Sequence, residues 1–76
     1  MFSYNISKVA DKEAFLKACA DVETTMEAIK KEKLLVDVDG SMVQWYNTLK
    51  GKIAIFNDYE VDAVYVDSEV DISCIF

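Results

Sequence analysis

The residues of this chain best suited to chemistry are carboxylates, and they gather in its last third. Residues 53–76 contain six acidic side chains and no basic one, namely Asp58, Glu60, Asp62, Asp67, Glu69 and Asp71. Carboxylates close together can carry out acid–base catalysis, bind a cation or attract a basic partner. The other residue types in the chain help to decide among these three uses.

Catalysis has little support from those other residue types. The chain contains no His and no Arg, so the commonest general base and the bidentate binder of phosphate are both missing. Cys19 and Cys74 fall on faces expected to point inward, where a thiol behaves as a small hydrophobic group. A chain of 76 residues with one predicted helix also has little room for a catalytic pocket. We therefore expect no enzymatic activity and no cofactor.

Metal binding is also not expected. Residues 37–40 (Asp-Val-Asp-Gly) share the opening acids of a calcium-binding loop, but the third acid and the distant Glu of such a loop are misplaced. Asp67, Glu69 and Asp71 could share a cation at a sheet edge, although alternating acids are also ordinary on a solvated strand. Two cysteines without Cys-x-x-Cys spacing predict neither a zinc site nor a disulfide framework.

The net charge of −6 is distributed unevenly along the chain. Residues 1–33 carry six Lys and six acids, whereas residues 34–76 carry two Lys and eight acids. Direct binding to nucleic acid or to an anionic membrane is therefore not expected, whereas attraction to a basic protein surface is. No apolar run approaches the roughly 18 residues of a membrane helix, and the first residues lack the order of a signal peptide. With few cysteines, a cytoplasmic protein is expected.

A helix is predicted over residues 11–33. Asp11 can cap its N-terminus. The apolar residues that follow are spaced four, three, four and three, which places them on one helical face: Phe15, Cys19, Val22, Met26 and Ile29. A coiled coil is an alternative interpretation of this spacing, but the strands expected downstream favour an amphipathic helix that packs on a sheet.

Alternation of apolar and polar residues predicts strands over 34–38, 41–46, 52–57, 59–66 and 69–76. We interpret Asp39-Gly40, Asn57-Asp58 and Asp67-Ser68 as two-residue turns between them. Residues 2–6 alternate in the same way and indicate an additional short strand. The expected architecture is a single α+β domain over 1–76, with the helix on one face of a mostly antiparallel sheet of about five strands.

The turns determine which side chains share a face of the sheet, because a strand alternates its side chains between faces. One face is free of charge and is expected to meet the helix, together with Val36, Val43 and Trp45; it contains Ala54, Phe56, Tyr59, Val61, Ala63, Tyr65, Val70, Ile72, Cys74 and Phe76. The other face mixes acids with aliphatic residues and is expected to stay open; it contains Ile53, Ile55, Glu60, Asp62, Val64, Val66, Glu69, Asp71, Ser73 and Ile75.

The expected open face is interpreted as a binding surface, since an apolar patch with a polar rim is typical of an interface. Its anchors would be Ile53, Ile55, Val64, Val66 and Ile75, and its steering charges Glu60, Asp62, Glu69 and Asp71. The sequence thus predicts a non-enzymatic interaction module that binds a basic protein. More specifically, this module could be an inhibitor or accessory factor of a nucleic-acid-handling protein, with carboxylates that imitate phosphates. A homodimer formed by stacking of the same face and a plain solvated face remain open.

Overall fold

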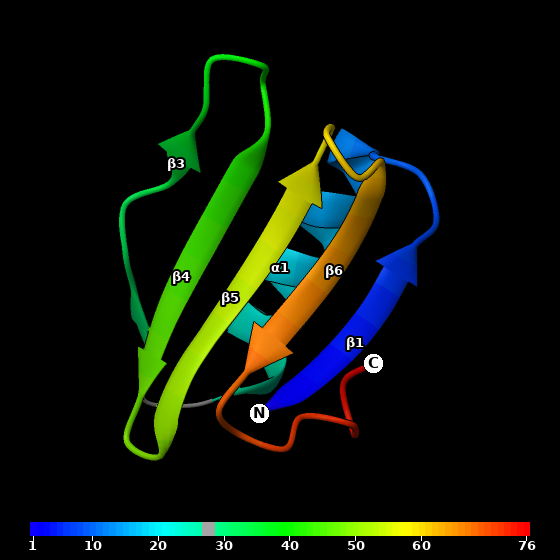
Figure 1. The fold of residues 1–76 in the computed structure, drawn as a ribbon. Coiled ribbons are helices and arrows are strands. Elements are labelled where there is room, and N and C mark those ends of the chain that lie inside the picture. The colour runs from blue at the N-terminus through cyan, green and yellow to red at the C-terminus, as the bar shows by residue number, and fades with distance from the viewer. Residues whose placement is uncertain (27–28) are drawn as a thin grey trace.

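In the computed structural model, which describes residues 1–26 and 29–76, one helix packs on one face of a six-stranded sheet (Figure 1). The elements are β1 (Phe2–Ser7), α1 (Lys12–Thr25), β2 (Lys30–Lys31), β3 (Leu35–Val36), β4 (Met42–Thr48), β5 (Gly51–Asp58) and β6 (Ala63–Ser68). The strand order is β1-β6-β5-β4-β2, with β3 also paired to β4, and every pair is antiparallel. The predicted α+β class, with its helix on an antiparallel sheet, is confirmed.

The helix begins as predicted but ends earlier. Asp11 is the N-cap, and its side chain accepts a hydrogen bond of 2.9 Å from the Glu13 N–H. The helix ends at Thr25, and Met26 is already extended (φ −94°, ψ 134°). Two β-branched Thr in the last turn favour extended backbone. The predicted end at residue 33 was therefore wrong: Lys30 and Lys31 pair with β4 instead, and positions 27–28 lie outside the described residues.

The first hairpin forms where Asp39-Gly40 predicts it, but its loop is one residue longer. The Asp37 N–H donates to the Ser41 carbonyl at 2.8 Å, and Gly40 takes a φ of 87°. The register is therefore Leu35 opposite Val43, rather than Val36 opposite Val43. Because the side-chain period of a strand is two residues, this shift by one changes which side chains of β3 and β4 share a face.

The two later turns were predicted at the wrong positions. Asn57 and Asp58 belong to β5, and the chain turns over residues 59–62, where the Asp58 carboxylate accepts the Glu60 N–H at 2.9 Å. Asp67 and Ser68 belong to β6. Residues 69–76 form no strand; instead β1 pairs with β6. The predicted strands 59–66 and 69–76 thus do not exist with those bounds.

These register changes exchange the two faces of the sheet. Ile53, Ile55, Val64 and Val66 face the helix and are each 0 % exposed. The acids predicted beside them lie elsewhere: Glu60 and Asp62 in the 59–62 loop, Glu69 and Asp71 beyond β6. With those acids outside the strands, the aliphatic face carries no carboxylate and can be buried, so the prediction that it stays open was wrong.

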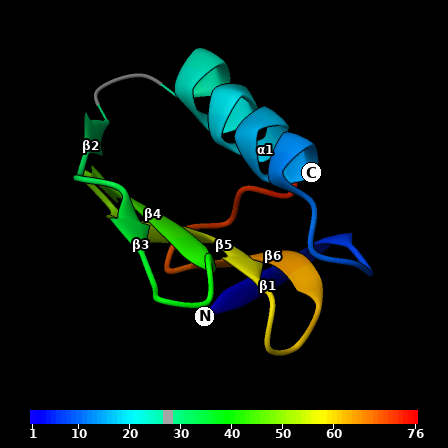
Figure 2. The same cartoon turned by 90° about the horizontal axis from the view of Figure 1, so that it is seen from above.

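The C-terminal segment completes this core. Ile72 is 1 % exposed, and the ring of Phe76 lies 6.0 Å from that of Tyr4, between centroids. Figure 2 shows the segment running between the helix and the sheet. The prediction that Ile72 and Phe76 pack in the core is confirmed. They belong, however, to an irregular segment and not to the predicted strand.

Gly51 is the position where the backbone tolerates a side chain least. Its φ is 151°, and an added Cβ would lie 2.8 Å from the Cβ of Glu69. At Gly40, with φ 87°, the nearest atom would be 3.4 Å away, on the flexible ring of Tyr59. We expect Gly51→Ala to lower the free energy of unfolding by about 3 kcal/mol and the control Gly40→Ala by about 1 kcal/mol. Urea denaturation measures both, and equal losses would contradict this difference.

Candidate functional site

The face of the sheet opposite the helix, here called the open face, is the candidate functional site. A row of apolar side chains crosses four strands on it, through the pairs Leu35 with Val43, Val43 with Phe56, and Phe56 with Tyr65. The rings of Phe56 and Tyr65 stack with centroids 4.7 Å apart and an interplanar angle of 13°. These four residues, called the apolar row, form one continuous strip from β3 to β6.

Trp45 widens the apolar row on the open face. Leu35 is 51 % exposed and Trp45 36 %. Trp45 lies opposite Ala54 on β5, whose small side chain leaves a shallow hollow of about 230 Å³ between Trp45, Phe56 and Asp67. Aromatic side chains offer a large apolar area with few rotatable bonds, and they are enriched in protein interfaces.

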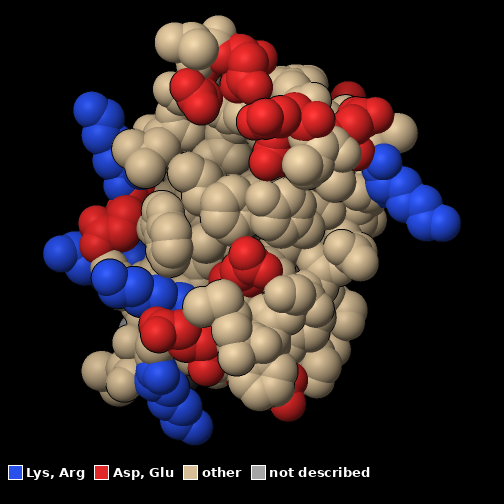
Figure 3. All heavy atoms as spheres, in the orientation of Figure 1, with Lys and Arg blue, Asp and Glu red and all other residues tan. Residues whose placement is uncertain are grey.

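A cleft of about 370 Å³ borders the apolar row on the side of the β3–β4 turn and the 59–62 loop. Leu35, Val43 and Phe56 contribute its apolar lining. Its carboxylates are Asp37, Asp39, Asp58 and Glu60. Figure 3 shows acidic side chains gathered at this end of the open face, a band of uncharged surface beside them, a separate acidic side chain near the centre, and Lys along the edge near β2 and β3. We call this region the acidic cleft.

Hydrogen bonds from the backbone hold three of these carboxylates in place, those of Asp37, Asp39 and Asp58. Asp39 accepts the Ser41 N–H at 2.9 Å, and Asp37 accepts the Val38 N–H at 2.7 Å. The Ser41 N–H, followed by the Ser41 hydroxyl, lowers the pKa of Asp39. Asp58 accepts the Glu60 N–H and, more weakly, the Tyr65 hydroxyl at 3.4 Å. The cleft therefore presents oriented negative charge before any partner arrives.

The structure does not bring the predicted anchors to this surface. Ile53, Ile55, Val64 and Val66 lie under the helix, and Ile75 is partly buried against the same core. The first four are 0 % exposed, so they stabilise the fold and are not accessible to a partner.

The four predicted steering charges do not lie together on one surface. Glu60 lines the acidic cleft. Asp62 accepts the Ala10 N–H at 2.8 Å, and Glu69 accepts the Lys52 N–H at 2.8 Å. Asp71 accepts the Tyr4 hydroxyl at 3.2 Å and the Ser73 N–H at 3.1 Å. These three carboxylates thus connect distant segments of the chain. Of the four, Glu60 lines the acidic cleft, and Glu69 also borders the hollow beside Trp45.

Sequence reasoning missed the members of the open face. Val43, Trp45, Phe56 and Tyr65 were grouped on one face correctly but assigned to the helix side. A usable signal was present, because the alternative set, Ile53, Ile55, Val64 and Val66, is entirely β-branched and aliphatic. Such residues are the ones most often fully buried, whereas Trp and Tyr more often keep one edge in water.

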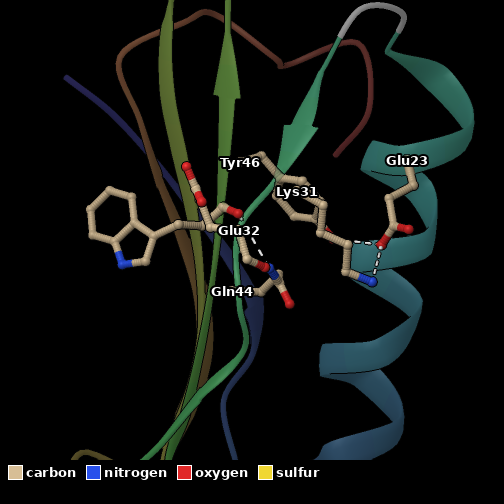
Figure 4. Close-up of polar contacts among 6 residues, drawn as sticks. Glu23, Lys31, Glu32, Gln44 and Tyr46 are labelled. Carbon is tan, nitrogen blue, oxygen red and sulfur yellow. Dashed lines mark hydrogen bonds and ion pairs between the residues drawn. The ribbon is translucent and has the colours of Figure 1, made fainter.

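A second polar cluster joins the helix to the sheet (Figure 4). The Tyr46 hydroxyl donates to Glu23 Oε2 at 2.6 Å, and Lys31 Nζ lies 3.4 Å from the same oxygen. Gln44 Nε2 donates to the Glu32 carbonyl at 2.6 Å. Tyr46 is 0 % exposed, and this burial, with the Glu23 carboxylate next in effect, raises the pKa of its hydroxyl. A neutral Tyr46 donor thus anchors α1 to β4, and Lys31 ties in β2.

Cys19 lies beside this cluster, in a hollow of about 290 Å³ that Glu23, Lys31 and Gln44 also line. Burial raises the pKa of the Cys19 thiol. Because the thiolate is the nucleophilic form, a thiol held protonated is a weak nucleophile. Cys19 is therefore better suited to packing between the helix and the sheet than to covalent chemistry.

Within residues 1–26 and 29–76, no group of three or more His, Cys, Asp or Glu side chains is arranged to hold a metal ion. Over the same residues, no helix has the length and apolar character needed to cross a bilayer.

Comparison of the chain with protein-family models, with curated proteins and with solved structures finds no match. The function of this chain is therefore inferred from the geometry and chemistry of its open face.

The Tyr46–Glu23 hydrogen bond should contribute measurably to stability. Tyr46→Phe removes a buried hydroxyl and leaves the Glu23 carboxylate without that donor, so we expect a loss of about 1–2 kcal/mol in the free energy of unfolding. Tyr59→Phe is the matched control, because Tyr59 is 47 % exposed; its effect should be within about 0.5 kcal/mol. Urea denaturation decides, and a Tyr46→Phe variant as stable as the parent would contradict the role of this bond.

Asp71 should make stability depend on pH in the acid range. The Ser73 N–H, followed by the Ser73 hydroxyl and the Tyr4 hydroxyl, lowers its pKa in the folded state below the ordinary value of 3.8. A lowered folded pKa stabilises the protein above the unfolded pKa, and this contribution is lost as the pH falls through the folded pKa. Asp71→Asn keeps an oxygen acceptor for the Ser73 N–H but does not titrate.

The Asp71→Asn variant should therefore lose less stability than the parent between neutral pH and about pH 2.5. Urea unfolding at the two pH values measures the difference. The same stability loss in both proteins would mean that Asp71 does not couple protonation to folding.

Proposed function

We propose that this chain is a non-enzymatic protein-interaction module that binds a basic partner through its open face. One observation carries the proposal: α1 covers one side of the sheet, while the other side carries an uninterrupted apolar row that is bordered along its length by the acidic cleft. An exposed apolar patch with a charged rim is typical of a surface that is buried in a complex.

The two parts of the open face would act differently in binding. Leu35, Trp45 and Phe56 offer the apolar area whose burial drives association. The carboxylates of the acidic cleft raise the capture rate of a basic protein and disfavour acidic ones. An Arg or Lys of the partner could lay its apolar stem on Leu35 and Val43, place its charge among the carboxylates and face the ring of Phe56.

An inhibitor or accessory factor of a nucleic-acid-handling protein is the concrete version. The net charge of −6 and the row of fixed carboxylates at one end of the sheet support it, since such proteins carry basic surfaces built for phosphates. A cytoplasmic setting is part of the proposal. Two free cysteines, Cys19 and Cys74, fit a reducing compartment.

Stacking of two open faces into a homodimer is less favoured. It would bring two acidic clefts onto one buried surface, where like charges without counter-charges are costly. Self-association through this face would be detected separately, in the labelled protein without peptide.

The first test uses an arginine-rich peptide with interspersed leucines as the probe, titrated into the ¹⁵N-labelled protein. We expect chemical-shift changes confined to β3, β4, β5 and the 59–62 loop. Leu35→Ser and Glu60→Lys should each raise the Kd about tenfold, because they remove an exposed anchor and invert a cleft charge. Glu13→Lys, on the first turn of α1, makes the same charge change away from the open face and should leave the Kd within about twofold.

Equal weakening by Glu60→Lys and Glu13→Lys would mean that binding follows net charge alone, and it would reject the open face as the site. The nucleic-acid-mimic version needs one further result. Basic proteins retained by the immobilised chain should be released by duplex DNA and should not be retained by the Leu35→Ser, Glu60→Lys double variant. Shift changes on the open face, at β3, β4 and β5, that grow with protein concentration in the absence of peptide would instead reveal self-association through that face.

A further inference from the structure

The two edges of the sheet are protected very differently. At one edge, β2 and β3 are two residues long each, carry Lys30 and Lys31, and are offset by one residue in their pairing with β4. The Gln44 side chain fills the gap by donating to the Glu32 carbonyl. Short strands, Lys side chains and a break in register are the devices that keep a sheet edge from pairing with another chain.

The β1 edge has almost none of these devices. Its six residues, Phe-Ser-Tyr-Asn-Ile-Ser, carry no charge, and its one irregularity lies near the end, between Asn5 and Ser7. Phe2 is 44 % exposed. Within the described part of the chain, β1 has a strand neighbour on one side, β6, and forms the outer border of the sheet on the other (Figure 1). Its outward N–H and C=O groups can therefore pair with an added strand.

We propose that β1 of one molecule pairs antiparallel with β1 of a second copy, so that two six-stranded sheets join into one. Antiparallel pairing of identical strands is two-fold symmetric, with the axis normal to the sheet. The N–H groups of each β1 edge can then donate to the C=O groups of the other. Both helices then lie on the same side of the joined sheet. Both open faces lie on the other side, uncovered.

Charge favours this strand over the rest of the surface as the contact between copies. Two molecules of charge −6 repel each other, but β1 brings no charge into the contact. Asp67, which accepts a 2.8 Å hydrogen bond from the Ser3 hydroxyl, lies on β6. The two Asp67 residues of a dimer would thus be three strand spacings apart, at least about 14 Å, which exceeds the Debye length of about 8 Å at physiological ionic strength.

The dimer is independent of the proposed function, although it would make each assembly bivalent for a partner. Dimerisation is measured on the protein alone, and partner binding with the arginine-rich peptide. Failure of either experiment therefore leaves the other interpretable.

The first measurement is the mass of the protein in solution by light scattering, from micromolar to millimolar concentration and at low and high salt. We expect a monomer–dimer equilibrium that shifts toward dimer as salt screens the net charge. Amide hydrogen exchange of the same samples should show protection of β1 amides that rises with concentration, because edge N–H groups become hydrogen-bonded.

Variants then locate the contact. Asn5→Lys adds a charge to β1 at an exposed side chain and should raise the dimer Kd at least about tenfold. Val36→Lys, at a residue 62 % exposed on β3, adds the same charge at the opposite edge and should leave the Kd within about twofold. Circular dichroism confirms that both variants fold.

A monomer at every concentration would overturn the proposal. So would a dimer whose β1 amides exchange as in the monomer, or one that Asn5→Lys and Val36→Lys weaken equally. If Asn5→Lys does not fold, the concentration dependence of exchange in the parent protein decides by itself.

Discussion

The constraint on which this structure depends is that one helix must bury one face of a sheet wider than itself. Helix α1 has 14 residues, about 21 Å of length. Its buried face, Phe15, Ala18, Cys19 and Val22, covers the centre of the sheet, and the C-terminal segment adds Ile72 and Phe76 beside it. Because no second helix is present among the described residues, the other face of the sheet stays open.

Local features of the fold were predictable, and the pairing of strands was not. The cap at Asp11 and the apolar face of α1 depend on neighbours within four residues, so the sequence reveals them. Register depends on loop length, which here is decided by single hydrogen bonds such as that from the Glu60 N–H to Asp58. The pairing of β1 with β6 joins the two ends of the chain, and alternation within either strand carries no information about it.

The candidate site was predicted in kind but mostly not in its residues. Alternation correctly separated the set with Ile53 and Ile55 from the set with Ala54 and Phe56, but it does not say which set meets the helix. In the structure the acids lie outside the strands, so the set with Ile53 and Ile55 faces the helix. Of the predicted site residues, Glu60 alone lies in the acidic cleft. The hydrogen bonds in the turns that set the register also hold carboxylates of the cleft in place. A partner would therefore meet charges that are already ordered, which lowers the entropic cost of binding.

The charge of this protein and its exposed apolar row are best understood together. A row of Leu, Val, Phe and Tyr side chains on an open sheet face favours stacking of two molecules through that face. A face that served solubility alone would not need such a row. The acidic cleft beside the row opposes such stacking, because two open faces would bring like charges together. In the proposed function, a basic partner would remove that repulsion and bury the apolar row in the same contact. Charge would then restrict the open face to partners of opposite sign, and the uncharged β1 edge would be the place where the two copies of the proposed dimer meet.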